Sequence, residues 1–369
     1  MDSLAAQGSG GSGMWEVTEE DLEPIAIGAG ILGTGGGGNP YLGFLRAREA
    51  LRKVGRVVVI DPDEVLDDQR LIVSGGMGSP VVSYEKLPQG DEEANAVRAM
   101  EQHLGYRFDA IAPFEMGGGN SMAPLVVGAK LDIPVVDGDG MGRAFPELQM
   151  TTYLIYGGSA APAALADERG NRVILSEVTD AKWLEKIARA VTIEMGGHAG
   201  LASSPMDGTH CRRTIIPNTL RLAYRIGVAV LDARRAHQDP SEAIISVTGG
   251  CRYLRGKVVD LERRTTRGFA KGHLILEGTG DDLERVIRIE FQNENLVILE
   301  DGEPRVVVPD LITLVSTDRG EPLTTEVVRY GFRADVLTIP CHELLKTPKA
   351  LEVVGPRAFG YDLDFTPII

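Results

Sequence analysis

The sequence predicts a two-domain α/β protein, with a layered amino-terminal α/β domain followed by a β-rich α+β domain. Up to about residue 178, short apolar runs typical of buried strands alternate with stretches of helical periodicity, a pattern that indicates parallel strand pairs. Beyond that point, strand-like runs follow one another, separated by turn residues. The 369 residues suit two domains, which we place at 14–178 and 179–369. Residues 1–13, MDSLAAQGSGGSG, are typical of an expression tag with a Gly/Ser linker.

Helices and strands alternate in the first domain. Thr18 is a candidate N-cap for a helix that continues to Leu32, and Asn39-Pro40 opens a second helix that ends near Val54. The next expected elements are strands at 56–60 and 70–74, a helix at 91–104, a strand at 108–114, a helix at 120–130, a strand at 133–137 and a helix at 146–155.

The second domain is expected to begin with helices and continue with strands. Helical patterns cover 181–195 and 212–236, and the second of these begins near Pro217 or before it. Turns such as Gly278-Thr-Gly and Asp301-Gly then separate several of the expected strands, at 254–261, 269–277, 286–291, 296–299, 305–308 and 311–315.

Glycine-rich polar segments follow three of the expected strands, at 75–79, 115–121 and 137–143, and a further segment, 33–38, joins the first two helices. In open α/β sheets, ligands bind outside the carboxyl ends of strands, so these segments could converge on one site. Successive N–H groups in such loops can also bind an anion. The substrate-binding residues predicted here are Gly36, Gly37, Gly38, Asn39, Met77, Gly78, Ser79, Asn120, Asp137 and Arg143.

Glu115, Asp139 and His198 are the candidate catalytic residues. Glu115 follows a strand and has no evident structural role, so it could bind a ring N–H or act as a general base. Asp139 lies two residues after Asp137 and could bind a metal or direct a water, whereas Arg143 could hold an anionic group or pair with an aspartate. His198 could reach an interdomain cleft as acid or base, or cap the end of the 181–195 helix.

Two other patterns suggest sites and carry weaker support. Gly28-Ala-Gly30-Ile-Leu-Gly33 matches GxGxxG, but it lies inside a helical pattern, without the preceding strand that a dinucleotide site needs. Close helix packing is the favoured interpretation, and NAD is an unlikely cofactor. The pairs His210-Cys211 and Cys341-His342 match no established zinc spacing, although a divalent metal at the predicted site stays open.

Composition restricts the class of partner. The net charge of −15 opposes binding to nucleic acid or to an anionic membrane, since both need a basic face. The sequence contains no run of about 18 apolar residues. Three widely spaced cysteines argue against a disulfide framework, so we expect a reducing, cytoplasmic location.

Several long motifs resemble the S-methyl-thiohydantoin desulfurase family, formerly linked to hydantoinase and oxoprolinase proteins. Ile31–Gly43, Glu115–Ser121 and Asp137–Met150 are similar to its amino-terminal domain, and Gly256–Arg264, Ile289–Asn295 and Val354–Asp362 to its carboxy-terminal domain. The resemblance implies an enzyme that releases a thiol hydrolytically from a small cyclic substrate and leaves a hydantoin. A homo-oligomer is expected.

In this hypothesis, Glu115 or Asp139 directs the water, and glycine-loop N–H groups with Asn120 grip the amide edge of the ring. Arg143 would bind a substrate carboxylate. Two alternatives stay open at this point: a non-catalytic partner subunit of a hydantoinase or oxoprolinase, and an NAD-dependent oxidoreductase.

Overall fold

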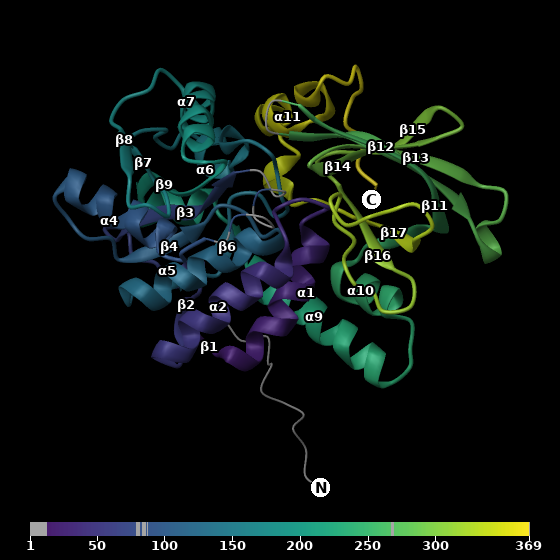
Figure 1. The fold of residues 1–369 in the computed structure, drawn as a ribbon, viewed down its shortest axis with the longest axis horizontal. Coiled ribbons are helices and arrows are strands. Elements are labelled where there is room, and N and C mark those ends of the chain that lie inside the picture. Colours follow the sequence, from purple (N-terminus) through teal and green to yellow (C-terminus); the bar gives the residue numbers. More distant parts are fainter. Residues whose placement is uncertain (1–12, 79–81, 83–85, 87, 267–268, 369) are drawn as a thin grey trace, which may run out of the picture.

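The computed structural model describes residues 13–78, 82, 86, 88–266 and 269–368. Its amino-terminal part contains a mixed sheet with helices, and its carboxy-terminal part contains a curled antiparallel sheet (Figure 1). The predicted fold class, a layered α/β part followed by a β-rich part, is confirmed.

The first sheet contains eight of the described strands in the order β1-β2-β5-β4-β3-β9-β7-β8. Its centre, from β2 through β5 and β4 to β3, is parallel, and the flanking pairs are antiparallel. The strands are β1 Trp15–Val17, β2 Val57–Ile60, β3 Arg70–Gly78, β4 Ala110–Pro113, β5 Val135–Val136, β7 Ala163–Ala166, β8 Arg172–Leu175 and β9 His198–Asp207.

Helices cover both faces of this sheet, because its central strands are apolar on both sides. Ile72 and Ile111 face one core, whereas Leu71, Val73 and Ala110 face the other. The first core is covered by α1 Leu22–Leu32, α2 Pro40–Val54, α4 Glu92–Leu104 and α5 Ala123–Leu131, and the second by α7 Ala181–Glu194 and α8 Gly208–Thr214.

Helix α2 is placed by local chemistry. The Asn39 side chain accepts hydrogen bonds from the backbone N–H groups of Tyr41 (2.8 Å) and Leu42 (3.4 Å), and Pro40 occupies the first turn. Gly55, at φ +84°, ends the helix. The cap therefore fixes the point at which the glycine loop 33–38 joins α2.

The second sheet contains seven of the described strands, all antiparallel, in the order β15-β14-β13-β12-β11-β17-β16. It curls until β14 approaches β16, where the Asn295 side chain donates to the carbonyl of Ile312 (3.0 Å). The strands are β11 Cys251–Thr266, β12 Phe269–Gly278, β13 Val286–Gln292, β14 Glu294–Glu300, β15 Glu303–Val307, β16 Leu311–Ser316 and β17 Arg333–Ile339.

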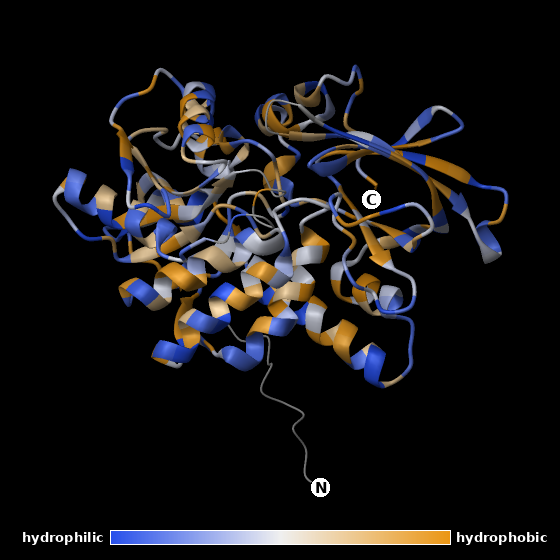
Figure 2. Cartoon of the chain, in the orientation of Figure 1, coloured by the Kyte–Doolittle hydropathy of each residue, from blue (hydrophilic) through white to orange (hydrophobic). Residues whose placement is uncertain are grey.

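Helix α9, Thr219–Arg235, connects the two parts by packing on α1. A Cβ atom on Gly28 would lie 1.9 Å from the carbonyl oxygen of Ala223, so the helices approach closely only because this position is glycine. The helix-packing interpretation of the GxGxxG pattern is therefore confirmed for Gly28. Figure 2 shows both apolar and polar residues along α1 and α9. Other described elements are β6 Gly138–Asp139, which pairs with β10 Ile216–Pro217, and helices α6 Thr152–Ile155, α10 Pro240–Thr248 and α11 Pro348–Val354.

Several element predictions were wrong. The expected helix at 146–155 is a short 3-10 turn followed by α6, and the one at 212–236 is interrupted by β10. The segment 75–78 continues strand β3 and pairs with β9, and His198 begins β9 instead of ending a helix. Strand β9 lies in the first sheet although it follows residue 179, and the boundary between 178 and 179 stays a prediction. No described helix has both the length and the apolar character needed to cross a bilayer.

Candidate functional site

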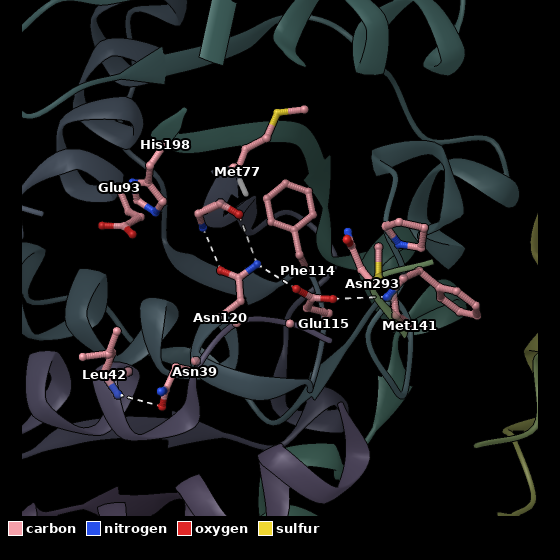
Figure 3. A pocket seen from close by; sticks show the side chains of 18 of the residues that line it. Asn39, Leu42, Met77, Glu93, Phe114, Glu115, Asn120, Met141, His198 and Asn293 are labelled. Carbon is pink, nitrogen blue, oxygen red and sulfur yellow. Dashed lines mark hydrogen bonds between the residues drawn. The ribbon is translucent and has the colours of Figure 1, made fainter. Parts of the chain in front are cut away.

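A cavity of about 340 Å³ lies where the glycine loop 33–38, strand β3, the segment after β4 and the turn between β13 and β14 meet. Both parts of the molecule therefore contribute to its walls (Figure 3). Its volume lies within the range of small-molecule sites. The predicted site residues that line it are Gly37, Gly38, Asn39, Met77, Gly78, Glu115, Asn120 and His198.

Glu115 is a buried ionisable group of the cavity that is held in place by two hydrogen bonds. It lies two residues beyond β4 and is 7% exposed. Its Oε1 accepts a hydrogen bond from the side-chain amide of Asn120 (2.9 Å), and its Oε2 accepts one from the backbone N–H of Phe145 (3.3 Å). Burial raises the pKa of Glu115 to about 8, although these two hydrogen bonds oppose the shift. At neutral pH Glu115 is therefore mainly a neutral carboxylic acid.

Asn120 holds this acid against strand β3. Its Oδ1 accepts from the backbone N–H of Gly76 (2.7 Å), and its amide nitrogen donates to the Gly76 carbonyl (3.2 Å) as well as to Glu115. The side chain is thus oriented by three partners (Figure 3). Asn120 therefore positions the carboxyl group of Glu115, and it does not cap the helix that follows.

His198 lies beside Glu93 (Figure 3), and a Cβ atom on Gly76 would lie 3.1 Å from His198 Nε2 and 3.6 Å from Glu93 Oε1. Burial lowers the pKa of His198, so the imidazole is neutral at pH 7. Glu93 is fully buried and accepts from Arg46 Nη2 at 2.6 Å. Burial alone would raise the pKa of Glu93, but the charge and hydrogen bond of Arg46 outweigh it, so this carboxylate stays ionised. The cavity therefore contains a neutral base, His198, next to an anion, Glu93.

Glu294 is a cavity residue that the sequence did not single out. It follows Asn293, whose φ of +59° makes the tight turn between β13 and β14. Its side chain is 2% exposed, and a Cβ atom on Gly36 would lie 2.0 Å from Glu294 Oε1. Gly36 itself does not line the cavity, so its role is to make room for this carboxyl group. A charged residue next to an expected turn is normally solvent-exposed, which explains why the pattern gave no signal.

Asp139 and Asp137 lie near the cavity but do not line it. Asp139 Oδ2 accepts from the backbone N–H groups of Met116 (2.8 Å), Met141 (2.9 Å) and Gly142 (2.7 Å). Burial raises the pKa of both aspartates to about 6. Asp139 thus fixes two glycine-rich segments in place. Asp137 accepts from the first backbone N–H groups of α9 and from the Arg221 guanidinium (3.2 Å).

Arg143 is fully buried and lies outside the cavity lining. A guanidinium has five N–H donors. Five hydrogen bonds use them, to the carbonyls of Ala144 (3.1 Å), Pro309 (3.1 Å), Asp310 (2.9 Å) and Asn295 (3.1 Å) and to Thr34 Oγ1 (2.8 Å). This geometry leaves no donor for a substrate carboxylate, so we assign Arg143 to the contact between the glycine loop and the second sheet.

Ser79 lies outside the described residues. Within the described ranges, no cluster of three or more His, Cys, Asp or Glu side chains is arranged to hold a metal ion. The remaining cavity wall is largely apolar, with Leu42, Met77, Phe114, Met141 and Phe145. Three buried acids, Glu93, Glu115 and Glu294, face this space together with the imidazole of His198. The guanidinium groups of Arg46 and Arg189 also line it, and each is paired with a glutamate.

Fold and site together define a two-domain α/β protein with a small, carboxyl-lined cavity between its two parts. Family comparison then identifies it: the chain belongs to the S-Me-THD-like family, whose N-terminal domain matches residues 20–177 and whose C-terminal domain matches residues 179–368. The resemblance to the S-methyl-thiohydantoin desulfurases is confirmed.

Two further similarities were found. A crystal structure of a protein from Chromobacterium violaceum superposes with a TM-score of 0.80 over 96% of this chain and 100% of its own, at 24% identity. It shows the same fold. Glutamate-1-semialdehyde 2,1-aminomutase of Methanococcoides burtonii is 24% identical over 196 residues, which cover 49% of this chain and 46% of that enzyme. This chain therefore matches under half the length of that relative.

Proposed function

We propose that this protein hydrolyses the carbon–sulfur bond of a small S-alkyl thiohydantoin. Water adds to the ring carbon that carries the alkylthio group, the C–S bond breaks, and a hydantoin and an alkanethiol leave. The S-Me-THD-like family membership supports the substrate class. The observation that carries the reaction is Glu115, a carboxylic acid that faces the cavity and has a pKa raised to about 8 by burial.

Glu115 acts as the general acid in this mechanism. The substrate carbon is bonded to sulfur and double-bonded to a ring nitrogen, and protonation of that nitrogen makes the carbon more electrophilic. At pH 7, a group with a pKa of about 8 is roughly 90% protonated. Asn120 and the Phe145 N–H each donate to one of its oxygens, so they fix its orientation. General acids of this kind contribute about 10²- to 10⁴-fold to the rate.

His198 acts as the general base. Because burial keeps the imidazole neutral, it can accept a proton from the attacking water. The imidazolium formed is then stabilised by the ionised Glu93, which Arg46 holds at 2.6 Å. As the tetrahedral intermediate collapses, its hydroxyl proton passes to the Glu115 carboxylate and restores the acid. The C–S bond breaks, and the leaving thiolate takes the proton held by His198. The surroundings thus assign the two roles: burial keeps Glu115 protonated, so it can act as an acid, and keeps His198 neutral, so it can act as a base.

The apolar wall suits the alkylthio group. Met77, Met141 and Phe114 line the cavity, and sulfur makes favourable contacts with aromatic rings and other polarisable groups. A methylthio group placed there would leave the polar edge of the ring to the carboxyl and amide groups.

The test is thiol release from S-methyl-thiohydantoin, followed with a thiol reagent, while hydantoin formation is followed by chromatography. Wild type should produce both in equal amounts, and Glu115→Gln should lose about 10²- to 10⁴-fold in kcat. Glu303→Gln, at the exposed start of strand β15, is the matched control and should keep full activity. Parallel assays with and without chelator show whether a metal takes part. A wild-type protein that releases no thiol from this compound or from ring-substituted analogues would overturn the proposal.

A further inference from the structure

Glu294 combines deep burial with an incomplete set of hydrogen bonds. Its side chain is 2% exposed, and Oε2 has no hydrogen-bond partner within the described structure. Leaving such an atom without a partner is unfavourable, because it has lost its contact with water and gained none in the protein. Because Glu294 lines the cavity, a ligand there can supply the missing partner.

The surroundings of Glu294 disfavour its ionised form. Among the described residues it forms no ion pair, and the charged groups that act on it are Glu115, Arg143 and Glu326. Burial raises the pKa of Glu294 well above its usual value, the Glu115 carboxyl adds to the shift, and Arg143 opposes it. All five donors of Arg143 are directed elsewhere, so no hydrogen bond from Arg143 compensates a charge on Glu294, and only a backbone N–H of Glu294 itself adds to the opposing effect.

A neutral carboxyl group has one O–H donor beside one carbonyl acceptor. This pair is complementary to a cis-amide edge, in which a ring N–H lies next to a C=O. An ionised carboxylate has only acceptors, and it would repel the carbonyl oxygen of that edge. The protonation state of Glu294 therefore decides which ligand edge the cavity can accept.

We propose that Glu294 is a specificity-determining residue that binds the cis-amide edge of a small cyclic ligand through two hydrogen bonds. The ring N–H donates to one carboxyl oxygen, and the carboxyl O–H donates to the neighbouring ring carbonyl. This inference rests on the proposed function, because it assigns the N3–H and C4=O edge of a thiohydantoin or hydantoin to Glu294. That edge is present in both substrate and product, so the product can serve as a probe without turnover.

The experiment measures binding of hydantoin, 1-methylhydantoin and 3-methylhydantoin by calorimetry. Wild type should bind the first two alike and bind 3-methylhydantoin about tenfold or more weakly, since the methyl group removes one hydrogen bond and blocks the other. Glu294→Gln keeps one donor and one acceptor and should retain this discrimination. Glu294→Ala should lose it, and thermal unfolding verifies that both variants are folded.

Other outcomes would overturn the role of Glu294. Equal discrimination in Glu294→Ala and wild type would show that another group reads the edge. A Glu294→Gln protein as defective as Glu294→Ala would show that the residue binds as a carboxylate, and failure of wild type to bind hydantoin would also refute the inference. Thiol release measured in parallel separates the two claims: turnover without discrimination overturns only the role of Glu294, and discrimination without turnover overturns only the proposed reaction.

Discussion

Replacing Glu115 by Gln tests whether burial of this carboxyl group couples stability to pH. The folded protein holds the pKa of Glu115 at about 8, against an ordinary value of 4.5. The raised value means that the folded state binds the proton more tightly than the unfolded state. The stability that this proton contributes is fully present below pH 4.5 and is lost as the pH rises through 8.

The size of the effect follows from the two pKa values. Between pH 4.5 and 8 the free energy of unfolding should fall by about 1.4 kcal/mol per pH unit, and the total loss should approach about 5 kcal/mol. Glu115→Gln removes this dependence because an amide does not titrate. It also leaves an NH₂ group facing either Asn120 or the Phe145 N–H, a pH-independent cost of about 1–3 kcal/mol.

The assay is urea denaturation of wild type and Glu115→Gln at pH 5, 6, 7, 8 and 9. The other buried carboxyl groups are present in both proteins, so the difference between the two curves reports Glu115. We expect Glu115→Gln to be the less stable protein at pH 5 and the more stable one at pH 9. Wild-type kcat should fall above pH 8, where the acid is lost.

A difference in stability that is constant from pH 5 to 9 would refute the reasoning, because it would show that the carboxyl group ionises in the folded state as it does in the unfolded chain. A wild-type kcat that rises through pH 8 would instead assign Glu115 the role of a base.

Three further predictions concern neighbouring residues. His198→Asn should lower kcat at least about 100-fold and remove the acidic limb of the pH profile, whose midpoint in wild type should lie below the ordinary value of 6.5 because burial lowers the pKa of His198. Arg143→Met should destabilise the protein by more than about 3 kcal/mol in urea denaturation, because it leaves five acceptors unpaired. Gly36→Ala should weaken hydantoin binding measured by calorimetry, because the added Cβ would lie 2.0 Å from Glu294 Oε1 and displace that carboxyl.

The sequence predicts an element correctly where neighbouring side chains determine where that element begins. Helix α2 begins at Pro40 because Asn39 caps it, and both residues are visible in the sequence. Strand β9 was missed because its sequence, HAGLASSPMD, is poor in β-branched and aromatic residues. It is a strand because it lies between β3 and β7, and tertiary pairing of this kind leaves no local pattern.

The candidate site, like the fold, could be predicted from the sequence only in part. Glu115 and Asn120 lie at the cavity, as expected for a polar segment after a parallel strand. Arg143, Asp137 and Asp139 follow β5 in the same manner, yet their side chains turn away from the cavity into protein contacts. The order of residues predicts which segments gather at a sheet edge, but the direction of each side chain depends on the packing around it.

The contribution of Glu294 depends on a contact between segments that are far apart in the chain. Arg143 joins Thr34, in the glycine loop, to the carbonyl of Asn295, next to Glu294. This bridge holds the β13–β14 turn against Gly36 and so keeps the Glu294 carboxyl away from water. Loss of the bridge would free the β13–β14 turn to move away from Gly36, and the Glu294 carboxyl would no longer be held at the cavity wall. A buried arginine that contacts no ligand can therefore influence which ligand the cavity accepts, because it fixes the position of an acid that does.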